Sequence, residues 1–354
     1  MNSKMAEEEN TRKKTNKPSL LKKWSTILNS CNLPENAEMD LISKFLLIIR
    51  SCVFSMTLMS GIIGGLLALS FTKQISWLNW VLSTIGIVIA HAVNNIINDF
   101  FDLQQGVDDD EYARAMYAPH PILAGLISKR NLILLALALN LIDVGILIYF
   151  MLTVNWYVLF FALAGIFISV FYVAPPINLK KHGLGEPAVF IIWGPLMIGG
   201  TFYVTTLGQI PYWVWIATIP YALIVTTILF GKHIDKHDPD KKKGIKTLPV
   251  IIGEKNARII NIVLMGLFYV VVIVLIAFKY QGIGLILTFL SIPRYIFVTK
   301  NYLKPKPEEP PKDWPIWPLW YVGFAFHLIR LSGLTLILGL LVNIFIPSQY
   351  LWFW

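Results

Sequence analysis

Long apolar stretches alternate with shorter polar ones along most of the chain. A helix that crosses a bilayer needs ~20 mainly apolar residues, because its backbone polar groups must be satisfied within the segment. Nine stretches meet this requirement, at residues 44–71, 77–99, 131–153, 156–175, 185–207, 212–231, 259–278, 282–299 and 319–346. The pattern predicts an all-α polytopic membrane protein of about nine transmembrane helices around a central cavity. A polar, disordered tail at residues 1–43 precedes this domain (residues 44–346), and a short aromatic end at residues 347–354 follows it.

The composition agrees with a membrane protein, since 56% of the 354 residues are hydrophobic. The first 40 residues are polar and contain no apolar stretch before a small-residue cleavage site, so we expect no signal peptide. Cys31 falls in the predicted tail and Cys52 in the first apolar stretch. Because these environments differ, we expect neither a disulfide nor a metal site from the two cysteines.

The basic residues are distributed very unevenly between the loops. Of the 30 Lys and Arg residues, 25 lie in residues 1–44, 100–130, 176–184, 232–258 and 300–318. Cytoplasmic loops of membrane proteins carry an excess of Lys and Arg. We therefore expect a multi-pass protein of the cell membrane, with its N-terminus, active site and cavity opening on the cytoplasmic side. Topology and the lipid bilayer explain the net charge of +9, so no nucleic-acid partner is expected.

A histidine, amides and carboxylates lie in the last part of the second apolar stretch and just after it. On a helix that advances ~100° per residue, five of these side chains fall within an arc of about 100°, namely His91, Asn95, Asn98, Asp99 and Asp102. Asp99 and Asp102 can both direct oxygens toward one Mg²⁺, and Asp108 continues the cluster. A solvated helix end is the alternative, but polar groups on one face within a membrane indicate a functional site.

A second acidic stretch, with Asp235, Asp238 and Asp240, follows the sixth apolar segment. Asp235 and Asp238 share a helical face. Two such clusters on one side of a membrane indicate a polyphosphate held through divalent metal ions. Lys241 and the lysines after it can neutralise a diphosphate, or they serve only the topology.

Three further positions between and beside the acidic stretches carry candidate chemistry. The planar fork of Arg114 suits bidentate phosphate contact, although a surface arginine explains it equally well. Tyr172 and the pair Lys180–Lys181 flank two prolines that end the fourth stretch. These side chains can therefore face the same cavity as the acids.

The chain from about residue 45 to 345 resembles the UbiA superfamily of intramembrane prenyltransferases. Residues 98–108, with Asn98-Asp99, Asp102, Gly106 and Asp108, resemble that family's Asn-Asp-x-x-Asp-x-x-x-Asp motif. Their form is most like the branch that prenylates 1,4-dihydroxy-2-naphthoate in the menaquinone pathway. The same branch is similar at residues 172–195 and at the Gly-x-x-Thr-Leu-Pro-Val element of residues 244–250.

The second acidic motif departs from the pattern of the family it resembles. That pattern places acids eight and four residues before the glycine that corresponds to Gly244. Here the nearer position is Asp240, but the farther one is Lys236, flanked by Asp235. Asp235 can supply the second carboxylate after a small helical rotation, with Asp238 as an extra ligand or a bystander.

The resemblance implies Mg²⁺-dependent transfer of a polyprenyl group from polyprenyl diphosphate to a small aromatic acceptor. The acceptor expected from the branch is 1,4-dihydroxy-2-naphthoate; hydroxybenzoate, homogentisate, a porphyrin or a glycerol-phosphate lipid are the alternatives. The expected catalytic residues are Asp99, Asp102, Arg114, Tyr172, Lys180 and Lys181. The expected substrate-binding residues are Asn95, Asn98, Arg114, Lys180, Lys181 and Lys241. The expected Mg²⁺ ligands are Asp99, Asp102, Asp108, Asp235, Asp238 and Asp240.

Two other classes compete with this interpretation. A CDP-alcohol phosphotransferase would need its acids within one short segment, whereas the two acidic groups here are more than 120 residues apart. A transporter would place charged groups at mid-membrane in discontinuous helices. Most acids here lie at one membrane face, which favours an enzyme.

Overall fold

The computed structural model describes residues 18–34, 36–72, 74–109, 118–312, 314 and 316–345, and this part of the chain is helical without any β-strand. Eight helical segments are long and apolar enough to cross a membrane: Ser51–Phe71, Trp77–Gln104, Lys129–Thr153, Gly185–Thr205, Tyr212–Asp235, Glu254–Ala277, Ile283–Tyr302 and Tyr321–Phe345. The fourth predicted stretch forms only the 14-residue helix Val158–Phe171. The all-α polytopic class is therefore confirmed, and a ninth crossing stays a prediction.

The elements follow one another along the chain with mostly short connections, and longer segments precede α7 and α16. In order they are α2 (Leu20–Ser30), α3 (Leu41–Ile48), η1 (Ser51–Val53), α4 (Phe54–Phe71), α5 (Trp77–Gln104), α7 (Lys129–Thr153), α8 (Val158–Phe171), η2 (Leu179–His182), α9 (Gly185–Ile191), η3 (Ile192–Gly199), α10 (Gly200–Thr205), α11 (Tyr212–Asp235), α12 (His237–Lys242), α13 (Leu248–Ile252), α14 (Glu254–Ala277), η4 (Ile283–Ser291), α15 (Ile292–Tyr302) and α16 (Tyr321–Phe345).

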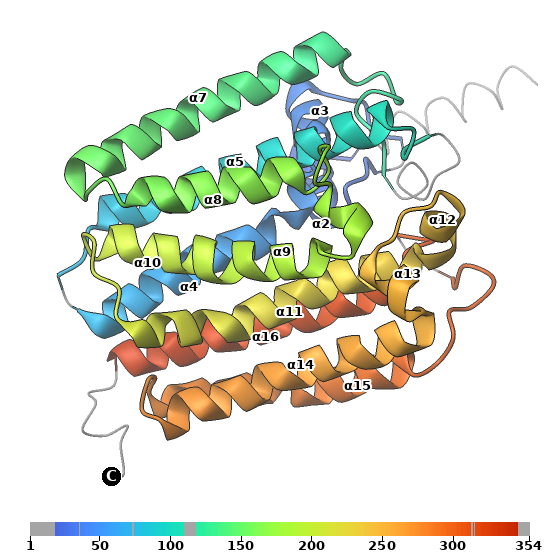
Figure 1. Cartoon of the computed structure of the whole chain (residues 1–354). Coiled ribbons are helices and arrows are strands. Elements are labelled where there is room, and N and C mark those ends of the chain that lie inside the picture. Colours follow the sequence, from blue (N-terminus) through green and yellow to red (C-terminus); the bar gives the residue numbers. More distant parts are fainter. Residues whose placement is uncertain are drawn as a thin grey trace, which may run out of the picture.

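The long helices lie side by side, and the short helices α2, α3, α12 and α13 gather at one end of the bundle (Figure 1). Helix α11 is central and packs against α9, η3, α14 and α16. Most of its side chains are buried, as expected for a helix that is apolar on nearly all sides. Helix α7 instead packs mainly on α5 and leaves side chains such as Leu141 and Leu152 exposed.

A close contact between α4 and α5 fixes the helix that carries the first acidic motif. A Cβ atom at Gly65 would lie 1.8 Å from Trp80 Cε2, so only glycine fits beneath this ring. The Trp80 Nε1 group donates a hydrogen bond to the carbonyl of Gly61 at 2.8 Å. Because Gly65 leaves room for the indole, α5 approaches α4 closely, and this contact holds the N-terminal end of α5 in the bundle.

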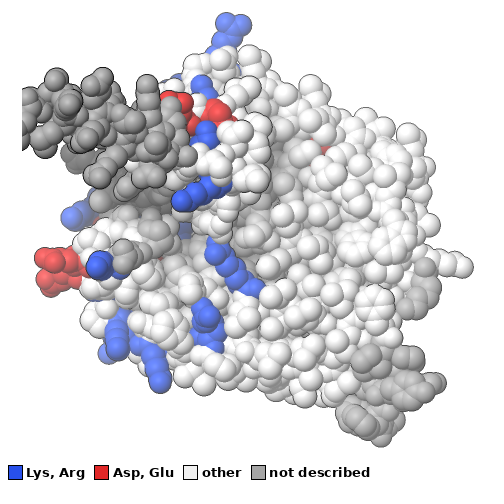
Figure 2. Space-filling view, turned by 180° about the vertical axis from the view of Figure 1, so that it is seen from behind, with Lys and Arg blue, Asp and Glu red and all other residues white. Residues whose placement is uncertain are grey.

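Charged side chains gather at one end of the face shown in Figure 2, and the remainder of that face is almost entirely uncharged. An apolar outer belt of this kind suits helices whose sides face lipid rather than water. Both acidic motifs lie at the charged end, which is where α5 and α11 finish. The predicted gathering of both motifs at one membrane face is consistent with this arrangement.

The predicted disordered tail contains ordered structure. Residues 20–30 form α2, which begins at Ser19, whose side chain accepts a hydrogen bond from the Lys22 amide. Lys23 pairs with Asp40 at 2.8 Å, and this ammonium holds the pKa of Asp40 below its usual range. Disorder is therefore wrong for residues 20–30. Residues 1–17 and 346–354 lie outside the described residues, and the predicted domain boundaries stay predictions.

The expectation that the cysteines are unpaired is also wrong, because Cys31 and Cys52 form a disulfide with their Cα atoms 5.2 Å apart. The first apolar stretch is broken at Arg50, which has a left-handed backbone conformation, and a new helical segment starts at Ser51. Cys52 therefore sits at the end of the bundle instead of deep within a span. Helix α2 packs on η1, which brings the two sulfur atoms together.

Candidate active site

A cavity of about 930 Å³ opens among the helices and has one polar end. Its walls come from α5, α7, α8, α9, η3 and α11, and most of them are apolar. The polar end is lined by Asn98, Asp102, Asp108, Lys180, Lys232 and Lys236. A ligand that matches this cavity has a charged head and an extended apolar body.

The last three turns of α5 place the first acidic motif. Asp99 and Asp102 are both buried, as the predicted polar face of this helix requires. Arg50 forms an ion pair with Asp99, in which its Nε donates to Asp99 Oδ2 at 3.0 Å. Asn95 donates to the carbonyl of Ile49, so it fixes the backbone next to Arg50. The buried Oδ1 of Asn98 lines the cavity and accepts no hydrogen bond among the described residues.

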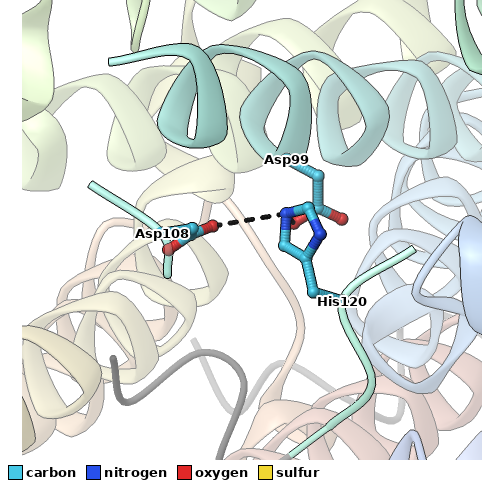
Figure 3. Close-up of side chains that lie close together, drawn as sticks. All are labelled: Asp99, Asp108 and His120. Carbon is cyan, nitrogen blue, oxygen red and sulfur yellow. Dashed lines mark ion pairs between the residues drawn. The ribbon is translucent and has the colours of Figure 1, made fainter. Parts of the chain in front are cut away.

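Asp99, Asp108 and His120 bring three potential ligand atoms within 4.8 Å of one another, and all three residues are buried (Figure 3). The Nε2 atom of His120 lies 3.7 Å from Asp99 Oδ1 and 3.7 Å from Asp108 Oδ2. Asp108 Oδ2 is buried and accepts no hydrogen bond among the described residues. Two neighbouring carboxylates, of which Asp108 has an unsatisfied oxygen, suit a hard divalent cation such as Mg²⁺, and the imidazole is placed to orient them.

Lys180 and Lys181 point to different partners although they are adjacent. Asn178 has a positive φ of 43° and starts the short helix η2, which turns Lys180 into the cavity. Lys180 Nζ donates to Asp102 Oδ2 at 2.7 Å, whereas Lys181 Nζ donates to Gln105 Oε1 at 2.6 Å. Burial alone would lower the pKa of Lys180, but the Asp102 carboxylate outweighs it and raises that pKa above the usual value. Lys180 is therefore a permanent cation beside the first motif.

Tyr172 lies at the C-terminal end of α8 and also lines the cavity. A Cβ atom at Gly185 would lie 3.3 Å from the Tyr172 hydroxyl and 3.4 Å from the ring of His233. His233 Nδ1 and Glu186 Oε1 are 2.7 Å apart in a buried pair. Glu186 in the Gly-Leu-Gly-Glu string therefore supports the wall next to Tyr172.

The structure places the three acids of the second motif in different surroundings. Asp240 is completely buried, and its Oδ1 lies 3.8 Å from Lys236 Nζ. Asp235 instead accepts hydrogen bonds from the backbone amides of Tyr321 and Val322, at 2.9 and 3.0 Å, and so caps α16. Asp238 is exposed and pairs with its neighbour His237. The helix breaks at Lys236 between α11 and α12, so the shared helical face predicted for Asp235 and Asp238 is not formed.

The same turn follows Asp102 and Asp240. In each case the amide five residues later donates to the aspartate carbonyl at 2.8 Å, at Val107 and at Ile245. Each turn also contains a glycine with positive φ four residues after the aspartate, 67° at residue 106 and 69° at residue 244. Val107 and Ile245 pack together as a small buried cluster. The two motifs are thus local structural repeats joined at their ends.

Lys243 strengthens this junction between the two motifs. Its Nζ donates to the carbonyl of Val107 and to Asp109 Oδ2, both at 2.6 Å. Lys241, by contrast, is exposed and does not line the cavity. Six of the predicted site residues line the cavity, namely Asn95, Asn98, Asp102, Asp108, Tyr172 and Lys180. Asp99 and Asp240 are buried next to it and pair with the lining residues Arg50 and Lys236. The structure places Asp235, Asp238 and Lys241 elsewhere, and Arg114 lies outside the described residues.

Several functional candidates were missing from the sequence-based prediction. They are Arg50, His120, Lys232 and Lys236 at the polar end, together with the Glu186–His233 pair behind it. Arg50 carried a usable signal, because a lone arginine in an apolar stretch needs a partner. His120 follows a segment without periodicity, so only the folded chain shows that it meets Asp99 and Asp108.

Comparisons with known proteins agree with this geometry. A model of the UbiA prenyltransferase family matches residues 57–322. The 1,4-dihydroxy-2-naphthoate octaprenyltransferase of Bacillus subtilis is 24% identical over 245 residues, which cover 69% of this chain and 76% of that protein. UbiA prenyltransferase domain-containing protein 1 of Dictyostelium discoideum is 27% identical over 281 residues, 76% of this chain and 82% of that protein.

The fold also matches solved structures. A UbiA homologue from Archaeoglobus fulgidus bound to GPP and Mg²⁺ superposes with a TM-score of 0.52 at 18% identity, covering 86% of this chain and all of that one. This likeness concerns the fold. Since the family match spans most of the membrane-embedded helices, the chain belongs to the UbiA prenyltransferase family.

Proposed function

We propose that this protein transfers a polyprenyl group from its diphosphate to a small aromatic acceptor, and that the acceptor is 1,4-dihydroxy-2-naphthoate. The observation that carries the proposal is the approach of the two distant motifs at the polar end of an apolar cavity, which Asp102 lines and where Asp240 is buried beside the lining residue Lys236. The charged end matches a diphosphate and the apolar walls match an isoprenoid.

Mg²⁺ fits the carboxylates at this end. Asp99, Asp102, Asp108 and Asp240 would hold it, while Asp235 and Asp238 are removed from the proposed ligand set by their positions. When bound, the ion supplies Lewis-acid neutralisation of the diphosphate oxygens. Mg²⁺ together with GPP in the Archaeoglobus fulgidus homologue supports this assignment.

The chain's own cations assist departure of the diphosphate. The bond between the allylic carbon and the diphosphate oxygen breaks, and the electron pair leaves with the diphosphate. Lys180 and Lys232 line the cavity beside Asp102, where their ammonium groups stabilise the developing negative charge. Arg50 keeps Asp99 oriented, as its ion pair shows.

The allylic cation is then attacked by an electron-rich carbon of the acceptor ring. With 1,4-dihydroxy-2-naphthoate, the carbon that bears the carboxylate forms the new bond, and loss of CO₂ restores the aromatic ring. Tyr172 and Trp193 line the cavity and offer π faces to the cation. The apolar walls from α8 and η3 exclude water, which would otherwise hydrolyse the cation.

The acceptor and the cellular setting are supported by different observations. The Bacillus subtilis relative supports the naphthoate, whereas the Dictyostelium discoideum relative is named only by its domain. Hydroxybenzoate, homogentisate, a porphyrin and a glycerol-phosphate lipid are the competing acceptors. The basic loops support a cell-membrane protein whose N-terminus and active site are on the cytoplasmic side.

The test is a prenyl-transfer assay on purified protein in lipid nanodiscs. Radiolabelled geranylgeranyl diphosphate is offered with each acceptor, in Mg²⁺ or in EDTA, and products are separated by chromatography. We expect Mg²⁺-dependent prenylation of 1,4-dihydroxy-2-naphthoate. Product with another acceptor alone would discard the naphthoate and keep the reaction class. Equal background with every acceptor in wild type and Asp102→Asn would refute prenyl transfer.

A further inference from the structure

Arg330 is a cation within the apolar helix α16, roughly two and a half turns after that helix begins at Tyr321. Its side chain is exposed and lines the cavity, and it forms no hydrogen bond or ion pair with any of the described residues. A charged side chain within a membrane span is costly, and such groups pair with a partner or mark a binding site. The guanidinium is therefore available to an anionic ligand in the cavity.

His327 lies three positions before Arg330, on the same side of α16, and also lines the cavity. Its Nδ1 atom is hydrogen-bonded to the Nη1 group of Arg294 in α15. Because a guanidinium has only donors, Nδ1 accepts this bond, and the ring hydrogen of the neutral imidazole is on Nε2. Arg330 and His327 together thus present N–H donors to the cavity. The other α16 residues that line it carry no carboxylate, and they are Val322, Gly323 and Phe326.

Contacts between helices give the depth of Arg330 in the bundle. One turn further along α16, a Cβ atom at Gly333 would lie 2.7 Å from the Sδ atom of Met59 in α4. In the same part of α4, the hydroxyl of Thr57 is 2.7 Å from Nδ1 of His91 in α5. The backbone of Arg330 is therefore at about the level of His91.

The acidic motif of α5 begins at Asp99, roughly two turns nearer the charged end than this level. Helix α16 starts at that end, where Asp235 caps it, and side chains on a helix lean toward its N-terminus. The Arg330 side chain therefore leans toward the motif from deeper in the cavity. A diphosphate beside Asp102 and Lys180 directs its allylic carbon, and the ring that attacks this carbon, toward the same depth.

We propose that Arg330 and His327 bind the carboxylate of the aromatic acceptor, so that the enzyme selects a carboxylated ring. A planar guanidinium matches a carboxylate in a bidentate contact, and the His327 Nε2–H group adds a further donor. In 1,4-dihydroxy-2-naphthoate the carboxylate is on the carbon that forms the new bond, so holding it positions that carbon against the prenyl donor. This inference rests on the proposed function, since it assumes an aromatic acceptor in the cavity.

Equilibrium binding tests the proposal without turnover. Isothermal titration calorimetry is performed on purified protein in nanodiscs, with Mg²⁺ and inorganic diphosphate but no prenyl donor. The probes are 1-hydroxy-2-naphthoate and 1-naphthol, which lacks the carboxylate, and empty nanodiscs give the lipid background. Arg330→Gln should weaken naphthoate binding by about tenfold to hundredfold, as for the loss of a charged hydrogen bond, and leave naphthol binding within about twofold. Unchanged naphthoate affinity in Arg330→Gln would overturn the proposal.

Further variants separate charge from geometry. Arg330→Lys should retain part of the naphthoate affinity, because the charge stays and the planar fork is lost. His327→Phe should weaken naphthoate binding less than Arg330→Gln, since it removes only a neutral donor. Arg130→Gln is the matched control, because Arg130 is exposed at the start of α7 and does not line the cavity. It should bind both probes as the wild type does.

Two measurements identify other roles of Arg330. Thermal unfolding and the affinity for inorganic diphosphate should be unchanged in Arg330→Gln if the fold and the polar end are intact. A loss of diphosphate affinity in place of naphthoate affinity would mean that Arg330 contacts the donor, and would overturn the proposal. An effect confined to nanodiscs that contain phosphatidylglycerol would assign the arginine to lipid phosphate, with the same consequence.

Failure of the proposed function gives a different pattern. Carboxylate-dependent binding that is lost in Arg330→Gln, without prenyl product from any acceptor, would refute prenyl transfer and leave the carboxylate site standing. Prenyl product formed equally well from acceptors with and without a carboxylate would do the reverse.

Discussion

The two acidic motifs look alike in the sequence, but the structure brings different proportions of their acids to the site. Around α5, Asp99 and Asp102 both reach the site, because one continuous helix carries them on one face. Around α11 and α12, only Asp240 is brought to the same end, while Asp235 caps α16 and Asp238 faces solvent. Helical spacing predicts the direction in which a side chain points only as far as the helix continues.

Asp102 and Asp240 occupy equivalent positions in the two motifs. Both precede the same turn, with a glycine four residues later and a buried aliphatic residue after it. The shared turn identifies Asp240 as the acid of the second motif that corresponds to Asp102. Substitutions in the two motifs test this difference between them.

The largest effect is expected from Asp102→Asn, which removes a buried carboxylate from the proposed metal site and leaves Lys180 without its charged partner. Turnover should fall by about 100- to 1000-fold, as for the loss of a major electrostatic contact to the transition state. Initial rates of prenyl transfer at saturating Mg²⁺ measure this. Full Mg²⁺-dependent activity in both Asp102→Asn and Asp99→Asn would remove these residues from the metal site.

Asp240→Asn should reduce turnover by about 100-fold, since its carboxylate is the counterpart of Asp102 in the repeated turn. Asp238→Asn is the matched control two residues away, and its exposed side chain predicts a rate within about twofold of wild type. The same transfer assay compares the two. If Asp238→Asn were the more damaging change, the assignment of the second motif by its turn would be incorrect.

Lys180→Gln should weaken binding of the prenyl diphosphate by about tenfold, because it removes a charged hydrogen-bond donor at the polar end of the cavity. Lys181→Gln should have a much smaller effect, since Lys181 contacts Gln105. The apparent KM for the prenyl donor distinguishes the two variants. Equal losses would mean that the cavity does not discriminate between these neighbouring lysines.

The smallest effect on chemistry is expected from Asp235→Asn, whose consequence is on stability. Asp235 accepts two backbone hydrogen bonds at the start of α16, and weakening them should lower the free energy of unfolding by about 1–2 kcal/mol. Thermal unfolding should shift down while the rate per folded protein stays near wild type. A rate loss like that of Asp240→Asn would return Asp235 to the site.

Much of the fold and about half of the site followed from the sequence. Apolar length identified the membrane helices, and helical periodicity placed Asn95, Asn98, Asp99 and Asp102 on one buried face. Periodicity did not reveal the break at Lys236, although Pro239 is a local signal for it, because proline has no amide to donate to the carbonyl of Asp235 four residues earlier. The Cys31–Cys52 bond was missed for a similar reason, since the break at Arg50 is not apparent in an apolar run.

The partners of His120 and Arg50 are determined by the fold, although the lone Arg50 in an apolar stretch already indicated that it needs one. His120 is 21 residues from Asp99 in sequence, and only the folded loop brings its ring to 3.7 Å from that carboxylate. Arg50 reaches the same residue from the connection between α3 and η1. Contacts of this kind depend on how loops cross the end of the bundle, and one sequence carries little information about them.

Helix α7, which packs on α5 and is otherwise largely exposed, forms with α8 the outermost wall of the cavity. Leu137 and Val144 of α7 line the cavity. We expect a cavity bounded on one side by the α7–α8 hairpin alone to exchange its apolar contents with the bilayer. The effective concentration of a prenyl donor is then its mole fraction among the lipids, and doubling the lipid at constant donor should slow the enzyme as a dilution would.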